Sequence, residues 1–267
     1  MALYHLILVA LIQGLTEFLP VSSSGHLVLL PGLTGLDDQG QVIDVAAHVG
    51  TLAAVVLFFR ADVALALGGL GHLARGRLDT PGAFLALALV VATIPVIIVG
   101  LILKVTGLSE AMRSVAVIGW AMLIFGLVLY WADRRGTEER VAGQWTMRHA
   151  VIMGLWQAVA LIPGTSRSGI AITGARILGY ERRSAAKLSM LMSIPTIIAS
   201  ATLLGLDVVR DADLAAARDG AIVAALSFVA ALAALSFMMR LLQSVSFTPY
   251  VIYRVILGVI LLWVAYT

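Results

Sequence analysis

Long apolar runs dominate the chain. A helix that crosses a bilayer needs about 20 mainly apolar residues, and six segments meet that requirement. Backbone polar groups inside a bilayer need internal partners, so each segment is expected to be helical. The predicted spans are 41–60, 82–104, 112–132, 184–204, 220–242 and 249–267. The pattern predicts an all-α polytopic membrane protein with six transmembrane helices.

Two further apolar stretches are interrupted near their middle. Residues 2–33 contain Leu-Pro-Val-Ser-Ser-Ser-Gly at 19–25, and residues 148–178 contain Ile-Pro-Gly-Thr-Ser-Arg-Ser-Gly at 162–169. Proline followed by a Ser/Gly cluster ends one helix and starts another. Each flanking half is too short to cross alone. We therefore expect two re-entrant helix–loop–helix hairpins, each entering and leaving on one side.

The order of elements repeats along what we predict to be a single membrane domain, 1–267. A hairpin followed by three spans occupies approximately 1–132 and again 145–267. The two breaks share one spacing, with glutamine and glycine at 13 and 25 and again at 157 and 169. Three spans per half is an odd number, so the pattern predicts an inverted-topology repeat. The alternative is that the two breaks arose independently.

Basic residues indicate the orientation. With the N-terminus outside and both hairpins re-entrant, most of the 18 Lys and Arg residues fall in inside loops. The inside group is Arg60, Arg75, Arg77, Arg134, Arg135, Arg140, Arg148, Arg176, Arg182, Arg183, Lys187 and Arg240. The outside group is Lys104, Arg113, Arg210 and Arg218. This bias follows the positive-inside rule and would disappear if either hairpin crossed the membrane. Both termini are expected outside.

Composition excludes several other classes. Hydrophobic residues make up 61% of the chain and charged residues 12%, about half the roughly 25% charged residues of soluble domains. The absence of cysteine excludes disulfides and a thiolate nucleophile. The net charge is +3, and no run of Lys or Arg exceeds two residues. We therefore expect basic loops beside a membrane and no nucleic-acid partner.

Polar residues at membrane depth gather in the two breaks. A charge there costs about 3 kcal/mol on insertion scales, so each one needs a reason. The set comprises Gln13, Glu17, Ser22, Ser23, Ser24 and His26 in the first break, Gln157, Thr165, Ser166, Arg167 and Ser168 in the second, Asp44 and His48 on the first span and Arg254 on the last. In each break a loop leads into the start of a helix. The free backbone N–H groups at a helix start can bind an anion. The planar guanidinium of Arg167 suits phosphate. Together the breaks would form a phosphate pocket with acid/base groups.

Each of these polar residues could instead have a purely structural role. Glu17 and Arg167 could form only an intramembrane ion pair. The serines of the first break could merely cap a helix, and His26 could be a structural histidine. Arg254 could pair with an acid or extend its charge toward the membrane surface. The Asp and His four residues apart on the first span could bind only each other.

Three segments resemble a known family. The segment 13–26, QGLTEFLPVSSSGH, is similar to the first signature of the bacterial undecaprenyl-diphosphate phosphatases of the bacitracin-resistance type. The segment 163–169, PGTSRSG, is similar to their second signature, and 44–55, DVAAHVGTLAAV, to the region between them. Arg254 lies where a late arginine is expected, and the resemblance covers essentially the whole chain. One departure is Gln13, because the family's first signature often begins with glutamate. Glu17 alone would then carry the anionic role.

The resemblance implies hydrolysis of undecaprenyl diphosphate to undecaprenyl phosphate and inorganic phosphate. That reaction recycles the lipid carrier for peptidoglycan synthesis and confers bacitracin resistance. The implied location is the bacterial inner membrane, with both termini and the active-site opening on the periplasmic side. The partners would be the prenyl diphosphate lipid and the bilayer, and a homodimer is compatible with such a bundle.

We hypothesise a division of roles among the polar residues. The catalytic group would be Glu17, Ser23, His26 and Arg167. The phosphate-binding group would be Ser22, Ser24, Thr165, Ser166, Ser168 and Arg254, with Gln13, Asp44 and His48 in support. Arg167 would stabilise charge on the transferred phosphoryl group, His26 would act as general acid or base, and Glu17 as a base or a ligand to Mg²⁺ or Ca²⁺. The nucleophile could be Ser23, His26 or water.

Two other interpretations compete. Vanadium-haloperoxidase-like lipid phosphatases also use Ser-Gly-His and Ser-Arg fragments, but their second histidine follows the arginine. No histidine occurs in 168–175, SGIAITGA, which argues against that mechanism. A transporter or flippase for a phosphorylated prenyl lipid would also fit an inverted repeat with broken helices. A carrier has little use for a carboxylate beside its anion, so Glu17 favours the hydrolase.

Overall fold

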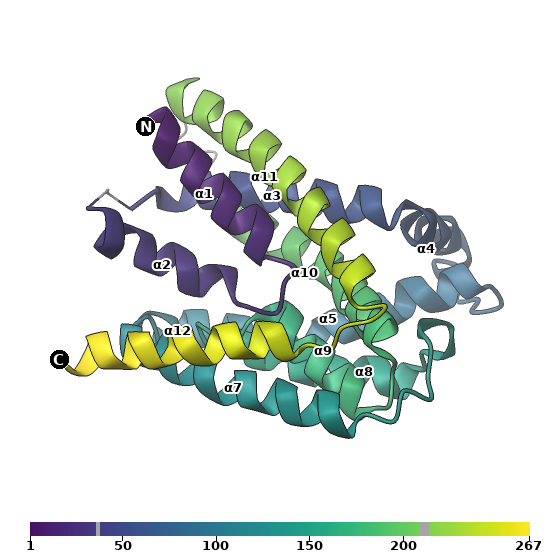
Figure 1. The fold of residues 1–267 in the computed structure, drawn as a ribbon. Helices are drawn as coiled ribbons and strands as arrows, with labels where there is room; N and C mark the ends of the chain where they lie inside the picture. Colours follow the sequence, from purple (N-terminus) through teal and green to yellow (C-terminus); the bar gives the residue numbers. More distant parts are fainter. Residues whose placement is uncertain (36–37, 209–213) are drawn as a thin grey trace.

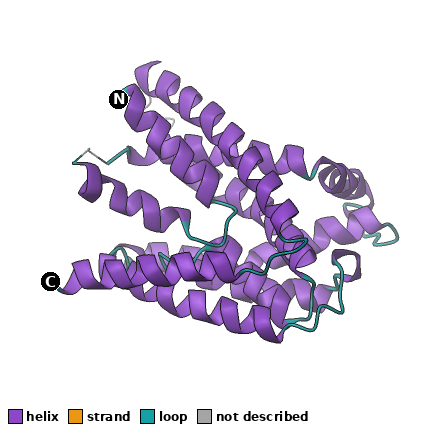
Figure 2. Cartoon of the chain, in the orientation of Figure 1, coloured by secondary structure: helices purple, strands orange, loops and turns teal. Residues whose placement is uncertain are grey.

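Helices and their connecting loops make up the structure. A computed structural model describes residues 1–35, 38–208 and 214–267. Over these ranges the chain forms helices, and no strand occurs among them (Figure 1, Figure 2). The all-α class predicted from the sequence is confirmed.

Six helices are long and apolar enough to cross a membrane, by length and composition, within the described ranges. They are α3 (Gly40–Phe58), α5 (Pro81–Thr106), α7 (Val115–Arg135), α10 (Arg182–Val208), α11 (Leu214–Leu241) and α12 (Thr248–Tyr266). Each matches one of the six predicted spans. The polytopic organisation predicted from the apolar runs is therefore confirmed.

Both interrupted stretches are broken where the sequence predicts. The first forms α1 (Leu3–Thr16) and α2 (Ser23–Thr34), and the second forms α8 (Met147–Ala158), the short 3₁₀ helix η2 (Val159–Leu161) and α9 (Arg167–Ile177). Helix α2 turns back beside α1, toward the end of the molecule that holds both termini (Figure 1). Re-entry of either hairpin into a bilayer remains a prediction.

Some elements were not predicted. Helix α4 (Arg60–Leu73) lies in the segment expected to be the loop 61–81, at the end of the molecule opposite the termini (Figure 1). Its glycine-rich sequence, RADVALALGGLGHL, is typical of a loop, but α4 packs along α5 and gains its stability there. Two short helices, α6 (Leu108–Ala111) and η1 (Ala142–Gln144), also lie in predicted loops. Arg210, assigned to an outside loop, lies outside the described residues.

Close packing between helices places the two breaks side by side. Helix α11 packs on α1 and α3, α10 on α3 and α9, and α7 on α9 and α12. Gly14 shows how tight the packing of α1 on α11 is, since a Cβ there would lie 2.8 Å from the carbonyl oxygen of Ser227. These contacts support the first break from one side and the second from the other.

Buried ion pairs tie the ends of α7, α9 and α10 together. Oδ1 of Asp133 lies 3.0 Å from Nε of Arg176 and 2.8 Å from Nε of Arg182. Its other oxygen accepts a hydrogen bond from the backbone N–H of Phe247 at 3.2 Å. Arg176 was assigned to an inside loop, and the structure places it in the last turn of α9, fully buried. Asp133 thus joins three helix ends and the segment that leads into α12.

Candidate active site

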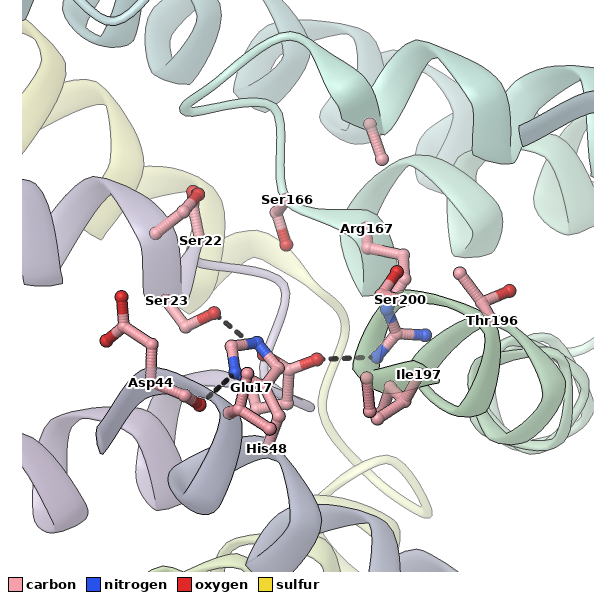
Figure 3. Close-up of a pocket in the computed structure, with 14 residues that line it drawn as sticks. Glu17, Ser22, Ser23, Asp44, His48, Ser166, Arg167, Thr196, Ile197 and Ser200 are labelled. Carbon is pink, nitrogen blue, oxygen red and sulfur yellow. Dashed lines mark hydrogen bonds and ion pairs between the residues drawn. The ribbon is translucent and has the colours of Figure 1, made fainter. Parts of the chain in front are cut away.

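The carboxylate of Glu17 lies at the meeting point of the two breaks. Its Oε1 accepts a hydrogen bond from Nη2 of Arg167 at 2.9 Å, which links the first break to the second. Its Oε2 accepts bonds from the side-chain amide of Gln13 at 2.9 Å and from the hydroxyl of Ser23 at 2.8 Å. Figure 3 shows Glu17 and Arg167 facing each other across the site. The predicted juxtaposition of the two breaks is present.

The two breaks use the same local structure. Ser22 and Ser166 are the N-cap residues of α2 and α9, and each side chain accepts a bond from the glycine N–H three residues on, at 3.4 and 3.2 Å. The first turn of a helix leaves backbone N–H groups without partners inside the helix. Those groups and the helix dipole favour an anion. Two such helix starts therefore face the same site.

A cavity of about 280 Å³ opens beside Glu17. Its polar lining comes from both breaks and from α3, and α10 supplies a further wall (Figure 3). The lining includes Glu17, Ser22, Ser23, Ser24, Asp44, His48, Ser166 and Arg167. Within the described part of the chain, Nη1 of Arg167 is buried and has no hydrogen-bond partner. One arm of the guanidinium therefore holds Glu17, and the other is available for a ligand oxygen.

His48 is the imidazole nearest to Glu17. Its Nε2 lies 3.8 Å from Oε2 of Glu17, and its Nδ1 donates to the backbone carbonyl of Asp44 at 2.7 Å. The carboxylate of Asp44 instead accepts a bond from Gln39 at 2.8 Å. The Asp44–His48 contact is thus made through the backbone and leaves the imidazole facing the cavity (Figure 3).

His26, assigned an acid/base role from the sequence, lies away from the cavity lining. Its Nδ1 donates to the backbone carbonyl of Ser22 at 2.6 Å, and its Nε2 accepts a bond from the hydroxyl of Tyr253 at 2.5 Å. The two rings stack, with centroids 5.6 Å apart. Both ring nitrogens are therefore engaged, and the imidazole supports the carbonyl of the N-cap residue.

Arg254, assigned to phosphate binding, is fully buried and lies outside the cavity lining. Its guanidinium donates to the carbonyls of Pro20 in the first break, at 3.4 Å, and Gly164 in the second, at 3.2 Å. It also donates to the carbonyls of Ala121 and Met122 on α7, both at 3.3 Å. Arg254 thus links the two breaks through their backbone carbonyls. It forms no ion pair with any residue that the structure describes, and it does not extend toward the membrane surface.

The remaining hydroxyls divide between the cavity and the packing behind it. Ser24 lines the cavity, with its hydroxyl 3.3 Å from that of Ser22. Ser168 donates to the carbonyl of Leu19 at 2.9 Å, so it joins the two breaks instead of facing the cavity. Thr165 is fully buried and also absent from the lining.

The residues present do not form a metal site made of protein alone. Among the described residues, no group of three His, Asp or Glu side chains converges. Both oxygens of Glu17 already accept hydrogen bonds, one of them from a guanidinium. Mg²⁺ or Ca²⁺ at Glu17 therefore stays a prediction.

Two contributions to the site escaped the sequence analysis. Helix α10 forms a cavity wall with Thr196 and Ser200 (Figure 3). A signal existed, because Ser189, Ser193, Thr196 and Ser200 recur with helical spacing in an otherwise apolar span. Tyr253 had no such signal, since tyrosine is an ordinary residue in an apolar membrane helix.

Known proteins resemble this chain over its whole length. The family model described as bacitracin resistance protein BacA matches residues 6–260. An undecaprenyl-diphosphatase from Dinoroseobacter shibae is 72% identical over 267 residues, and one from Ruegeria pomeroyi is 68% identical over 267 residues, each covering 100% of both chains. A third, from Chromohalobacter salexigens, is 46% identical over 264 residues and covers 98% of both chains.

Proposed function

The chain belongs to the bacitracin resistance protein BacA family, and we propose that it hydrolyses undecaprenyl diphosphate to undecaprenyl phosphate and inorganic phosphate. Relatives named undecaprenyl-diphosphatase match it from end to end at 68–72% identity. The reaction would return the lipid carrier to peptidoglycan synthesis. It would also confer bacitracin resistance.

One observation carries this proposal. Ser23 and Arg167 are each the first residue of a helix that starts at the cavity, and both bind the carboxylate of Glu17. The Nη1 of Arg167, which has no hydrogen-bond partner among the described residues, and two helix starts can bind the oxygens of a diphosphate. The carboxylate meets a hydroxyl at the same place. A site that only held an anion would gain nothing from Glu17.

Ser23 is our candidate nucleophile, with Glu17 as its base. The hydroxyl already donates to Oε2 of Glu17 at 2.8 Å. We propose that Oγ of Ser23 attacks the terminal phosphorus while its proton moves to Glu17. The bond from that phosphorus to the bridging oxygen breaks, and its electron pair leaves with undecaprenyl phosphate. Arg167 would stabilise the charge on the transferred phosphoryl group.

Water completes the cycle. Glu17 passes its proton to the departing undecaprenyl phosphate and then accepts one from a water molecule. The water oxygen bonds to phosphorus as the bond to Oγ of Ser23 breaks. Glu17 returns a proton to Oγ of Ser23 as that bond breaks, and inorganic phosphate leaves. His26 would position Ser22, since its ring nitrogens are engaged by Ser22 and Tyr253. Direct attack by water is the alternative, and isolating phosphoserine at position 23 would decide between them.

Several finer features belong to the same proposal. We place the protein in the bacterial inner membrane, with both termini and the cavity on the periplasmic side. The odd number of spans per half supports an inverted repeat, and a homodimer is compatible with the bundle. Mg²⁺ or Ca²⁺ at Glu17 would be held mainly by the diphosphate, since Mg²⁺ commonly combines one or two carboxylates with substrate phosphates. Activity after dialysis against a chelator would test the cation.

Phosphate release by purified protein in detergent tests the proposed activity. We expect inorganic phosphate and undecaprenyl phosphate in equal amounts. A carrier or flippase for a phosphorylated prenyl lipid would bind undecaprenyl diphosphate and release no phosphate. Binding without phosphate release would contradict the proposed hydrolysis and favour the carrier.

A further inference from the structure

The cavity at Glu17 has walls of two kinds. The side formed by the breaks carries hydroxyls, a carboxylate and a guanidinium. The remaining lining carries no charge, and its apolar members are Val45 of α3, Ala160 of η2, and Ile197 and Ala201 of α10, beside the hydroxyls of Thr196 and Ser200. A diphosphate suits the first side. The second side suits a hydrocarbon.

A smaller cavity of about 110 Å³ leads away from the same polar residues. It shares Ser23, Ser24, Asp44 and His48 with the larger one. Its other lining combines apolar Leu27 and Val28 with the amides of Gln13 and Gln39 and the charged side chains of Asp38 and Arg113. A hydrocarbon chain in this branch would strip water from charged groups, which is costly. The apolar wall is the better exit for a prenyl chain.

The apolar side of the larger cavity borders the outer surface of the bundle. Ser200 is exposed, and Val45 and Ala201 are half-buried. Val49, one turn after Val45 on the same face of α3, is 46% exposed. Exposed apolar side chains on membrane-spanning helices contact lipid. The α3–α10 side of the cavity therefore lies next to the outer surface of the bundle.

Resting on the proposed function, we infer that the undecaprenyl chain of the substrate leaves the cavity between α3 and α10, past Val45, Ile197 and Ala201. A cavity of about 280 Å³ is smaller than most drug-sized ligand sites and cannot enclose so long a chain. The chain would remain in lipid while the diphosphate reaches Arg167. The α3–α10 opening is thus a binding subsite for the first isoprene units.

Ser200→Trp tests this subsite, because an exposed serine at the opening can accept a large ring without disturbing the core. The two substrates are undecaprenyl diphosphate and dimethylallyl diphosphate, which has one isoprene unit. We expect kcat/KM for the long substrate to fall at least about tenfold and that for the short one to change less than about threefold. If dimethylallyl diphosphate is hydrolysed too slowly to measure, its inhibition constant against undecaprenyl diphosphate is measured in place of its kcat/KM.

Ile198→Trp is the matched control. It adds the same ring two residues away, at a position that is already exposed and does not line the cavity. It should leave both substrates unchanged. Equal losses on both substrates for Ser200→Trp, or no loss on the long one, would overturn the α3–α10 subsite. Wild-type protein that releases no phosphate from undecaprenyl diphosphate would instead refute the proposed function.

Discussion

Ser22 and Ser166 adopt closely similar backbone conformations with positive φ, of 76° and 69°. Each is the N-cap of the helix that follows it. Residues other than glycine rarely occupy positive φ, and such strain gathers at functional sites. In each break the next residue, Ser23 or Arg167, reaches Glu17. The same strained turn therefore delivers a hydroxyl from one side and a guanidinium from the other.

Arg167→Lys should reduce turnover by about 100-fold or more. Lysine keeps the charge, but its single ammonium group cannot hold Glu17 and a phosphate oxygen with two separate nitrogens. Removing one preorganised donor to developing charge typically costs about 3–4 kcal/mol. The measurement is kcat on undecaprenyl diphosphate, with Arg218→Lys, exposed on α11, as the control. Near-normal turnover in folded Arg167→Lys would remove Arg167 from the transition state.

Arg254→Lys should affect stability as well as turnover. Lysine cannot reach all four carbonyls that Arg254 binds. The carbonyls of Pro20 and Gly164 lie outside helices, and a buried carbonyl left unpaired costs about 1–3 kcal/mol. The Tm in detergent should therefore fall together with kcat, because the two breaks lose this link. The discriminating pair of measurements is Tm and KM. A raised KM at unchanged Tm would favour the phosphate-binding role that the sequence suggested.

The sequence predicts the architecture because membrane helices obey strong constraints. Six apolar runs had no other stable form in a bilayer, and proline followed by Ser/Gly clusters placed both breaks. Helix α4 was not predictable in this way, because its glycines are typical of a loop and its helical form depends on packing against α5.

The central contact of the site was predictable from the sequence, and the orientations of the surrounding side chains were less so. Opposite charges on the two breaks indicated that Glu17 and Arg167 meet. The orientation of His26 and Arg254 depends on groups far away in the sequence, namely Tyr253 for the first and the carbonyls of α7 for the second. Spacing within a motif carries no information about such partners.

Topology can be tested with single cysteines, since the chain has none. Glu139→Cys lies between α7 and η1 and Ala217→Cys near the start of α11, and both positions are exposed. With both termini outside, an impermeant thiol reagent should label the first only from the cytoplasm and the second only from the periplasm. Labelling of both from one side would mean that a hairpin crosses the membrane.

The opening of the cavity is predicted to face the periplasm. Ser24 is exposed and lines the cavity, so Ser24→Cys reports directly on access. An impermeant reagent should label it in intact spheroplasts, and undecaprenyl diphosphate should protect it. Reaction confined to inverted vesicles would reverse the predicted orientation while leaving the hydrolysis proposal standing.

The central claim is that Glu17 is the base of a diphosphatase and not merely the counter-ion of Arg167. Phosphate release from undecaprenyl diphosphate by wild type, Glu17→Gln and Glu139→Gln tests it most directly, with Tm measured on the same preparations. Glu17→Gln is nearly isosteric, and Glu139 is exposed and remote from the cavity. We predict at least about 100-fold slower release for Glu17→Gln at similar Tm, the usual scale for a lost general base, and wild-type release for Glu139→Gln. Near-wild-type release by Glu17→Gln with a clearly lowered Tm would contradict the claim and leave Glu17 as a structural ion-pair partner.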